Sequence, residues 1–197
     1  MSEALFEIPH QHVGGPLNVG HAECSPKWTE RMMLDLLRDR YDVNSGNGAR
    51  YVFAEHVRNQ CGFGGDIWGT GPLRTADAMA VDLWPSSGHR VHGFEVKVSR
   101  SDWLTELKDP EKAEAFRPYC DHWWLVVPDA AIVRDDLPPG WGLLTVSRGG
   151  LRAHKRAPKL DRQPMPFEMT VAWLRATAKT ARRDSPTTAG EGERGEG

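Results

Sequence analysis

Three charged side chains lie on two adjacent segments that the sequence predicts to be β-strands. Asp77 belongs to the first segment, residues 73–84, and Glu95 and Lys97 belong to the second, residues 90–98. Side chains two residues apart on a strand point to the same face, so Glu95 and Lys97 project together. Two carboxylates can hold a divalent cation, and an ammonium group can steer a water molecule or a phosphate. The pattern therefore predicts metal-assisted hydrolysis of phosphodiester bonds.

The first strand carries two aspartates that compete for a place in this cluster. Asp77 and Asp82 are separated by an odd number of residues, so they lie on opposite faces of the strand. If the turn closes with Trp84 opposite Arg90, Asp77 lies opposite Lys97 and shares its face. A shift of the pairing by one residue would reverse the choice. With this register we predict that Asp77, and not Asp82, is the acid of the cluster.

Each member of the cluster also has a structural interpretation. An acid near a strand end often caps the strand in solvent, and a Glu-x-Lys pair on a strand is often a surface ion pair. Glu95 and Lys97, however, lie in an otherwise apolar segment, which includes Val91, Phe94 and Val96. Charged groups in such a segment need a partner or a chemical role. This context favours a catalytic cluster over a surface pair.

The remaining elements must position this cluster. Ser25 and Pro26 predict the start of a first helix, Ser101 is a candidate cap for the helix after the second strand, and a second helix carries Glu55. A continuous apolar run at 122–127 predicts a strand buried on both faces. The full predicted order is helix 25–41, helix 49–60, strand 73–84, strand 90–98, helix 101–117, strand 122–127, hairpin 142–146 with 151–154, and helix 167–182. The expected fold is α/β, a mixed central sheet flanked by helices.

Length and composition bound the remaining possibilities. The chain of 197 residues is long enough for one domain, predicted at 25–183, between an N-terminal arm at 1–24 and a disordered tail at 184–197. No apolar run approaches the length of a membrane span, which predicts no membrane partner. The three scattered cysteines favour reduced thiols and a cytoplasmic location. The sequence does not indicate an oligomeric state.

The positive charge of the chain is concentrated near its C-terminus. The net charge is −2, but residues 148–183 contain ten basic and two acidic residues, a net charge of +8 for that segment. Such a segment is typical of a surface that contacts a phosphate backbone, although a solvated basic face is the alternative. We therefore expect DNA as the partner. Candidate DNA contacts are Ser99, Arg100, Arg152, Lys155 and Arg156.

Asp77 followed eighteen residues later by Glu95-Val96-Lys97 resembles the signature of the PD-(D/E)xK nuclease superfamily, whose core is a restriction-endonuclease-like mixed sheet between helices. Glu55, twenty-two residues before Asp77, matches an acid that many members carry on their first core helix. The segments 95–103, 119–128, 137–144 and 157–160 resemble the MmcB-like DNA-repair subgroup. The resemblance covers about residues 73–179, although Ala76 replaces the proline that names the motif.

This resemblance implies a metal-dependent deoxyribonuclease that acts in DNA repair or processing. Asp77, Glu95 and the Val96 carbonyl would hold Mg²⁺ or Mn²⁺, and Glu55 would complete the shell or bind a second ion. Lys97 would orient or deprotonate the attacking water, because a nearby dication lowers the pKa of a lysine.

Two other functions remain open from the sequence. One is a non-catalytic nucleic-acid-binding module on the same fold. The other is a zinc-tethered interaction protein, suggested by His21 with Cys24 and by His56 near Cys61.

Overall fold

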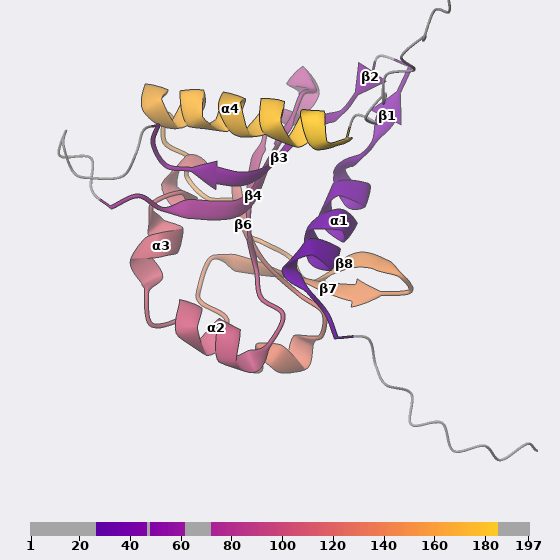
Figure 1. Cartoon of the computed structure of the whole chain (residues 1–197), viewed down its shortest axis with the longest axis vertical. Coiled ribbons are helices and arrows are strands. Elements are labelled where there is room, and N and C mark those ends of the chain that lie inside the picture. Colours follow the sequence, from indigo (N-terminus) through magenta and orange to yellow (C-terminus); the bar gives the residue numbers. More distant parts are fainter. Residues whose placement is uncertain (1–26, 47, 62–71, 185–197) are drawn as a thin grey trace, which may run out of the picture.

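The centre of the molecule is a strand that is buried on both faces. This strand, β6 (His122–Val127), consists of His-Trp-Trp-Leu-Val-Val, and its last five residues are all buried. A strand with apolar side chains on both faces is stable only between two packed layers. The computed structural model, which describes residues 27–46, 48–61 and 72–184, places β6 inside a six-stranded sheet (Figure 1).

The sheet is mixed, with the strand order β3-β4-β5-β6-β7-β8. Its other strands are β3 (Tyr51–Arg58), β4 (Thr75–Asp82), β5 (Val91–Val96), β7 (Trp141–Ser147) and β8 (Gly150–Lys155). The pairs β5·β6 and β6·β7 are parallel, and the other three pairs are antiparallel. A separate short ribbon consists of β1 (Asn44–Ser45) and β2 (Gly48–Ala49). The predicted α/β class with a mixed sheet between helices is confirmed.

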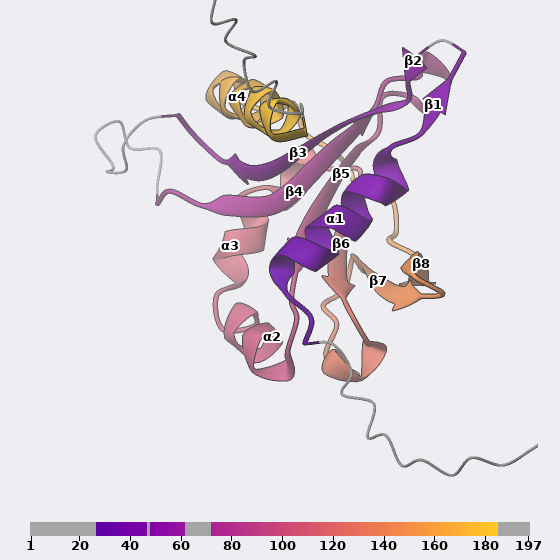
Figure 2. The same ribbon diagram turned by 45° about the vertical axis from the view of Figure 1, so that its right-hand side comes forward.

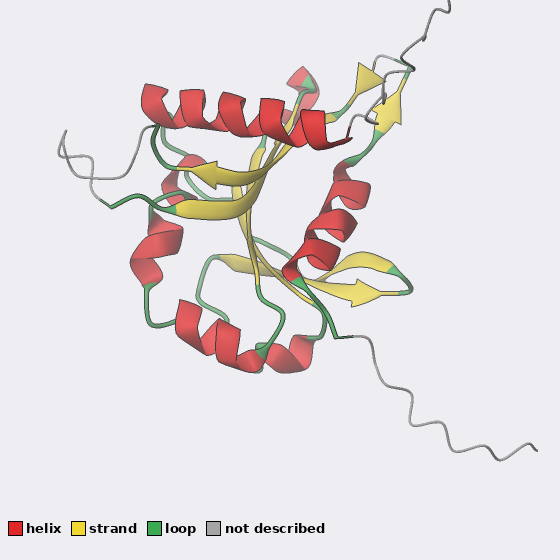
Figure 3. Ribbon diagram, in the orientation of Figure 1, coloured by secondary structure: helices red, strands yellow, loops and turns green. Residues whose placement is uncertain are grey.

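Four α-helices cover the two faces of this sheet (Figures 1 and 3). They are α1 (Glu30–Tyr41), α2 (Arg100–Glu106), α3 (Pro110–Glu114) and α4 (Phe167–Asp184). Helix α1 buries Met33, Leu34 and Leu37 in one apolar core. Side chains from the other three helices, among them Trp103 and Met169, enter a second core. Figure 2 shows α1 crossing the sheet while α4 lies along β3.

The predicted second helix is wrong, because residues 51–58 form the strand β3. Its sequence, Tyr-Val-Phe-Ala-Glu-His-Val-Arg, is rich in the β-branched and aromatic residues that pack well on a pleated surface. Pairing with β4 and packing against α4 complete this environment. Glu55 therefore lies on a strand and not on a helix.

The other element predictions differ from the structure mainly at their ends. The last helix, the strand 122–127 and the C-terminal hairpin are confirmed. Helix α2 is capped by Ser99, whose hydroxyl accepts a hydrogen bond from the Asp102 amide, and not by Ser101. Ser25, Pro26, the predicted arm 1–24 and the chain after 184 lie outside the described residues. Within the described ranges, no helix combines the length and apolarity that crossing a membrane requires.

One glycine permits the close packing around the second predicted strand. A β-carbon at Gly93 would collide with the ring of Trp123 on the neighbouring strand β6. The indole can lie flat against β5 because residue 93 has no side chain. Gly93 therefore helps to fix the position of β5, the strand that carries Glu95.

Candidate functional site

The site lies where strands β4 and β5 separate. At this end of the ladder the final residue pair is Ala78 with Phe94. Beyond this pair the Val96 amide donates a hydrogen bond to Asp77 Oδ2 at 2.7 Å. The Asp77 carboxylate thus occupies the position where a backbone carbonyl would continue the ladder. This contact ties Asp77 to the segment that carries Glu95.

The strand register differs from the prediction but keeps Asp77 on the expected face. Met79 pairs with Gly93, which is two residues away from the predicted register. Continuing the pairing brings Asp77 opposite Glu95 and not opposite Lys97. A shift by two leaves every side chain on the same face, whereas a shift by one would have exchanged the faces. The choice of Asp77 over Asp82 was therefore insensitive to this error.

Asp82 has a structural role at the other end of β4. Its Oδ2 accepts hydrogen bonds from Arg50 Nη2 at 2.9 Å and Nε at 3.2 Å, and its Oδ1 accepts one from the Trp84 amide at 3.0 Å. Both oxygens are used within the protein. Asp82 is therefore a strand-end residue that fixes the turn between β4 and β5.

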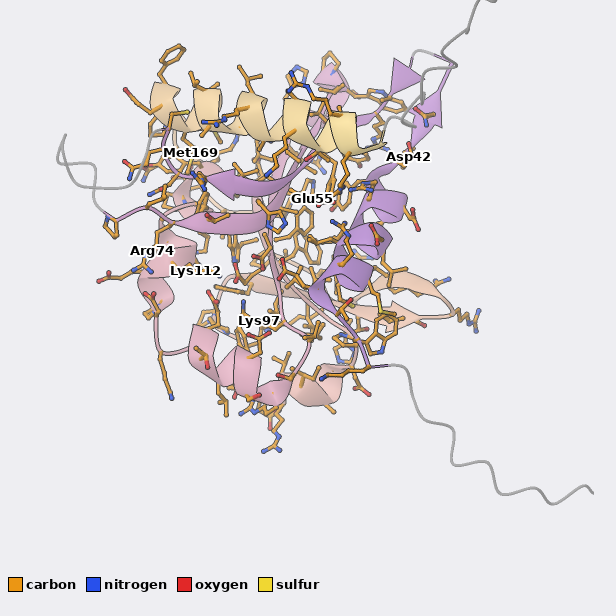
Figure 4. The ribbon with its side chains drawn as sticks, viewed as in Figure 1. Asp42, Glu55, Arg74, Lys97, Lys112 and Met169 are labelled. Atoms are coloured by element: carbon orange, nitrogen blue, oxygen red, sulfur yellow. The ribbon has the colours of Figure 1, made fainter. Side chains whose placement is uncertain are left out.

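Glu95 lies at the centre of a buried network of charges. Only 1% of its surface is exposed, and its Oε1 accepts a hydrogen bond from Lys97 Nζ at 2.5 Å and another from Lys112 Nζ. Both lysines also contact Glu106 Oε2, Lys97 at 3.0 Å and Lys112 at 3.2 Å. Figure 4 shows the two lysines beside α2 and α3. Two carboxylates and two ammonium groups thus alternate around one small space.

Burial and the nearby charges shift the pKa values in this network. Burial is the largest cause that raises the pKa of Glu95, and the Asp77 carboxylate is the second. The surroundings therefore disfavour the ionised form of this acid. Burial alone would lower the pKa of Lys97, but the carboxylates of Glu95 and Asp77 raise it. Lys97 is therefore a charged donor in this arrangement, whereas the sequence-based expectation of a lowered pKa assumed a dication beside it.

Sequence reasoning missed Lys112 and Glu106. Glu106 is 8% exposed, and its Oε1 has no hydrogen-bond partner among the described residues. It lies three residues after the buried Trp103, so both side chains project from the same face of α2. An acid on the apolar face of a helix that directly follows Glu95 and Lys97 was the signal that could have identified it. Lys112, in the short helix α3, has no comparable signal in the sequence.

Glu55 is separated from this network. Its carboxylate accepts hydrogen bonds from three arginines on two helices: Arg31 at 2.7 and 2.8 Å, Arg183 at 2.6 Å to each oxygen, and Arg38. Figure 4 places Glu55 between α4 and α1. Both oxygens are already saturated by guanidinium donors, which would also repel a cation. The arrangement makes Glu55 a structural anchor, and we do not keep it in the proposed metal site.

A second group of potential ligands lies beside Asp77. The carboxylates of Glu30 and Asp77 and a ring nitrogen of His56 all lie within 4.8 Å of one another. The register of β3 and β4 places His56 opposite Asp77, but these two residues are not paired in the ladder. The φ of His56 is 51°, in the left-handed region. Such a φ is uncommon for a residue other than glycine. Both Glu30 and His56 are exposed.

The structure separates the predicted DNA contacts into two groups. Ser99 caps α2, and Arg100 is held by Asp136 Oδ2 at 2.5 Å and by two backbone carbonyls of residues 132 and 133. Both side chains therefore have partners within the fold. Arg152, Lys155 and Arg156 are exposed on or just after β8, the edge strand farthest from β3. Three strands, β5, β6 and β7, separate β8 from β4, which carries Asp77.

The cysteines give no support to a zinc site within the described part of the chain. Cys61 is exposed, Cys120 is buried, and both are free thiols. The cluster of Glu30, His56 and Asp77 does not include either of them. His21 and Cys24 lie outside the described residues.

Comparison with known proteins identifies the fold but no family. No family model matches the sequence, and no curated protein matches it. A solved structure described as the SPO1766 protein of unknown function from Silicibacter pomeroyi is similar, with a TM-score of 0.50 and 19% sequence identity. The similarity covers 87% of this chain and 99% of that one. At this identity the likeness concerns the fold alone.

Proposed function

We propose that this protein is a metal-dependent DNA nuclease that hydrolyses phosphodiester bonds with Mg²⁺ or Mn²⁺ and acts in DNA repair or processing. The observation that carries the proposal is the convergence of Asp77, Glu95 and Lys97 at the separation of β4 and β5. The resemblance of these residues to the PD-(D/E)xK signature gives independent support. The cytoplasm is the compartment expected from the free thiols.

The residues at this point suit a hard divalent cation. Asp77 and Glu95 are carboxylates close enough for the first to raise the pKa of the second, and a cation between them would relieve that repulsion. Oxygen donors of this kind are the ligands that Mg²⁺ and Mn²⁺ prefer. Asp77, Glu95 and the Val96 carbonyl would hold the ion, which would supply Lewis-acid polarisation of a phosphate.

The protein groups would then divide the remaining work. Lys97, charged and fixed by Glu95, would donate hydrogen bonds to the phosphate or to the attacking water and offset the charge that develops there. Glu106 would keep Lys97 in place through its contact at 3.0 Å. The neighbouring carboxylates alone raise the pKa of Lys97 and keep it a charged donor, whereas a dication beside it would lower that pKa.

A cleavage assay tests the proposal. The purified protein is incubated with Mg²⁺ or Mn²⁺ and with single-stranded, duplex, flap and branched DNA. We expect cleavage of at least one substrate, and we expect Asp77→Asn and Lys97→Ala to reduce it by about 100-fold or more. The matched control is Asp82→Asn, which removes a charge from the same strand outside the site. Cleavage of none of these substrates, or full activity of both site variants, would refute the proposal.

One observation favours the non-catalytic alternative, a nucleic-acid-binding module. Lys112 contacts the same Glu95 oxygen as Lys97, so both positive charges are directed at the acid that the metal would need. A pure binding module predicts DNA binding that needs no metal and survives Glu95→Gln, together with no cleavage by the unmodified protein.

A further inference from the structure

A groove of about 340 Å³ lies between the sheet and helix α4, next to the candidate site. It is lined on one side by residues of β3, of the segment that follows it and of β4, and on the other side by residues of α4. Its lining residues are His56, Arg58, Gln60, Cys61, Thr75, Ala172, Arg175, Ala176 and Lys179. The groove is large enough for a small ligand or part of a chain.

The charge of this groove has one sign. Arg58, Arg175 and Lys179 line it, and no aspartate or glutamate does. All three side chains are exposed, and none of them has a hydrogen bond or ion pair with another described residue. Arg175 and Lys179 are four residues apart on α4, a spacing at which like charges repel and destabilise a helix. Folding therefore gains nothing from this arrangement, whereas an anion between the cations would be stabilised by all three.

The groove continues into the candidate active site. His56 lines the groove and also lies within 4.8 Å of the Asp77 carboxylate. Thr75, another lining residue, is two positions before Asp77 on β4. On the far side of His56 from the cations the charge is negative, because Glu30 and Asp77 lie there. The groove thus has cations at one end and carboxylates at the other. This arrangement would suit a nucleic-acid chain, with one phosphate bound by the cations and the neighbouring phosphate placed beside the carboxylates.

We propose that this groove binds the phosphate backbone of DNA, with Arg58, Arg175 and Lys179 as the phosphate contacts and His56 at the passage to Asp77. This inference rests on the proposed nuclease function and names the surface by which that site holds its substrate. It places DNA at the β3–α4 edge of the sheet. The exposed cations of β8, three strands farther from Asp77, are then not the principal contact.

Two variants with the same change in charge test this assignment. The groove variant carries Arg58→Gln, Arg175→Gln and Lys179→Gln, and the control carries Arg152→Gln, Lys155→Gln and Arg156→Gln. Binding of fluorescent 20-nucleotide single-stranded and duplex DNA is measured by anisotropy in EDTA, at several salt concentrations, with circular dichroism as the check on folding. We expect the groove variant to bind at least tenfold more weakly and to lose about one unit of salt slope per phosphate contact removed. The control should change by less than threefold.

Cys61 provides a second test without any substitution in the groove. It lines the groove and is exposed, while Cys120 is buried, so in a Cys24→Ser background we expect maleimide to label Cys61. The 20-nucleotide DNA should slow labelling at least fivefold, and inorganic phosphate or a mononucleotide at the same phosphate concentration should slow it less than twofold. If free phosphate slowed the labelling of Cys61 as much as DNA does, the ligand of the groove would be a small anion and not the DNA backbone.

Three results would overturn the inference. They are the absence of salt-dependent DNA binding by the unmodified protein, equal or greater weakening in the β8 control, and unchanged labelling of Cys61 in the presence of DNA. All of these measurements are made in EDTA and without cleavage. Failure of the groove is therefore distinguishable from failure of the nuclease proposal, which the cleavage panel decides.

Discussion

Two glutamates, Glu55 on β3 and Glu95 on β5, are both almost fully buried, at 4% and 1% exposure, but the charges around them differ. Glu55 is held by three arginines, so its immediate group carries excess positive charge. Glu95 shares two lysines with Glu106 and lies near Asp77, so in its group three acids face two lysines. Planar guanidinium groups fix a carboxylate in geometry, whereas lysine ammonium groups are compact and can rearrange. One site stabilises the fold, and the other can accept a cation.

The largest expected effect is the loss of stability in Glu55→Gln. This change leaves three neighbouring guanidinium groups with only the exposed Asp35 as a counter-charge, and removing one partner of a buried charged group costs about 3–5 kcal/mol. Chemical denaturation monitored by circular dichroism measures the free energy of unfolding. Asp35→Asn, which removes an exposed acid that also contacts Arg31, is the matched control and should cost less than about 1 kcal/mol. A loss at Glu55 as small as in this control would contradict the anchor role.

The next effect concerns His92, a titratable group packed against aromatic rings. It packs against Tyr41, Phe94 and His122, and its Nδ1 faces Trp124 Nε1 at 3.3 Å. Burial, and then the nearby His122, lower the pKa of His92 to about 4, below the ordinary value of 6.5.

The unfolded chain therefore binds this proton at a higher pH than the native protein does. The stability that depends on neutral His92 is fully present above pH 6.5 and decreases as the pH falls toward 4, by up to about 3 kcal/mol. Thermal unfolding across this pH range should show the decrease. His92→Phe should flatten that part of the profile, while the exposed His154→Phe should leave it unchanged. A profile of the same slope in His92→Phe would rule out this assignment.

A smaller effect is expected on stability at Glu95 than at Glu55. In Glu95→Gln both lysines keep Glu106 as a partner, and the shape of the side chain is preserved, so we expect a change in unfolding free energy below about 1.5 kcal/mol. The same variant should lose nuclease activity if the proposed function is correct. Denaturation and cleavage measured on one preparation separate the two effects. A loss of stability equal to that of Glu55→Gln would remove the distinction between the two glutamates.

The smallest expected effect is that of replacing Lys112, and it tests whether the Glu95 site can accept a cation. This lysine shares an oxygen of Glu95 with Lys97, so it competes with a cation for that oxygen. Lys112→Met should lower the Mn²⁺ concentration needed for thermal stabilisation by about three- to tenfold, or roughly 1 kcal/mol. Lys108→Met, an exposed lysine just before α3, is the control. An unchanged or higher Mn²⁺ requirement would show that Lys112 does not compete with the cation.

The sequence predicted the core of the sheet better than its first strand, for a physical reason. The buried run of β6 and the hairpin of β7 and β8 have local signals, namely continuous apolar residues and a Gly-Gly turn. Residues 51–58 combine apolar side chains at spacings compatible with either a helix or a strand. Their state is decided by pairing with β4 and by packing against α4, which begins more than a hundred residues later. No local pattern contains that information.

The same distinction separates the site residues that were predicted from those that were missed. Glu95 is in β5 and Lys97 directly follows it, and their spacing of two residues places them on one face whatever the register. Asp77 required only the parity of the register to be correct. Glu55 was assigned to the metal site because the sequence does not show its three arginines. They come from α1, which precedes β3, and from α4, which follows it by more than a hundred residues. Lys112 reaches Glu95 from a five-residue helix whose position is set by tertiary contacts alone.

The binding of Arg183 to Glu55 makes the beginning of the sheet depend on the end of the chain. As the protein is synthesised, β3 and α1 leave the ribosome long before the final turns of α4. Until those turns arrive, the outer edge of β3 has no covering helix, and the acid at position 55 has only two of its three arginines. A nascent chain of this protein therefore cannot complete the surroundings of its first core strand until α4 has been synthesised, and shortened chains that stop before α4 would expose a strand edge prone to association.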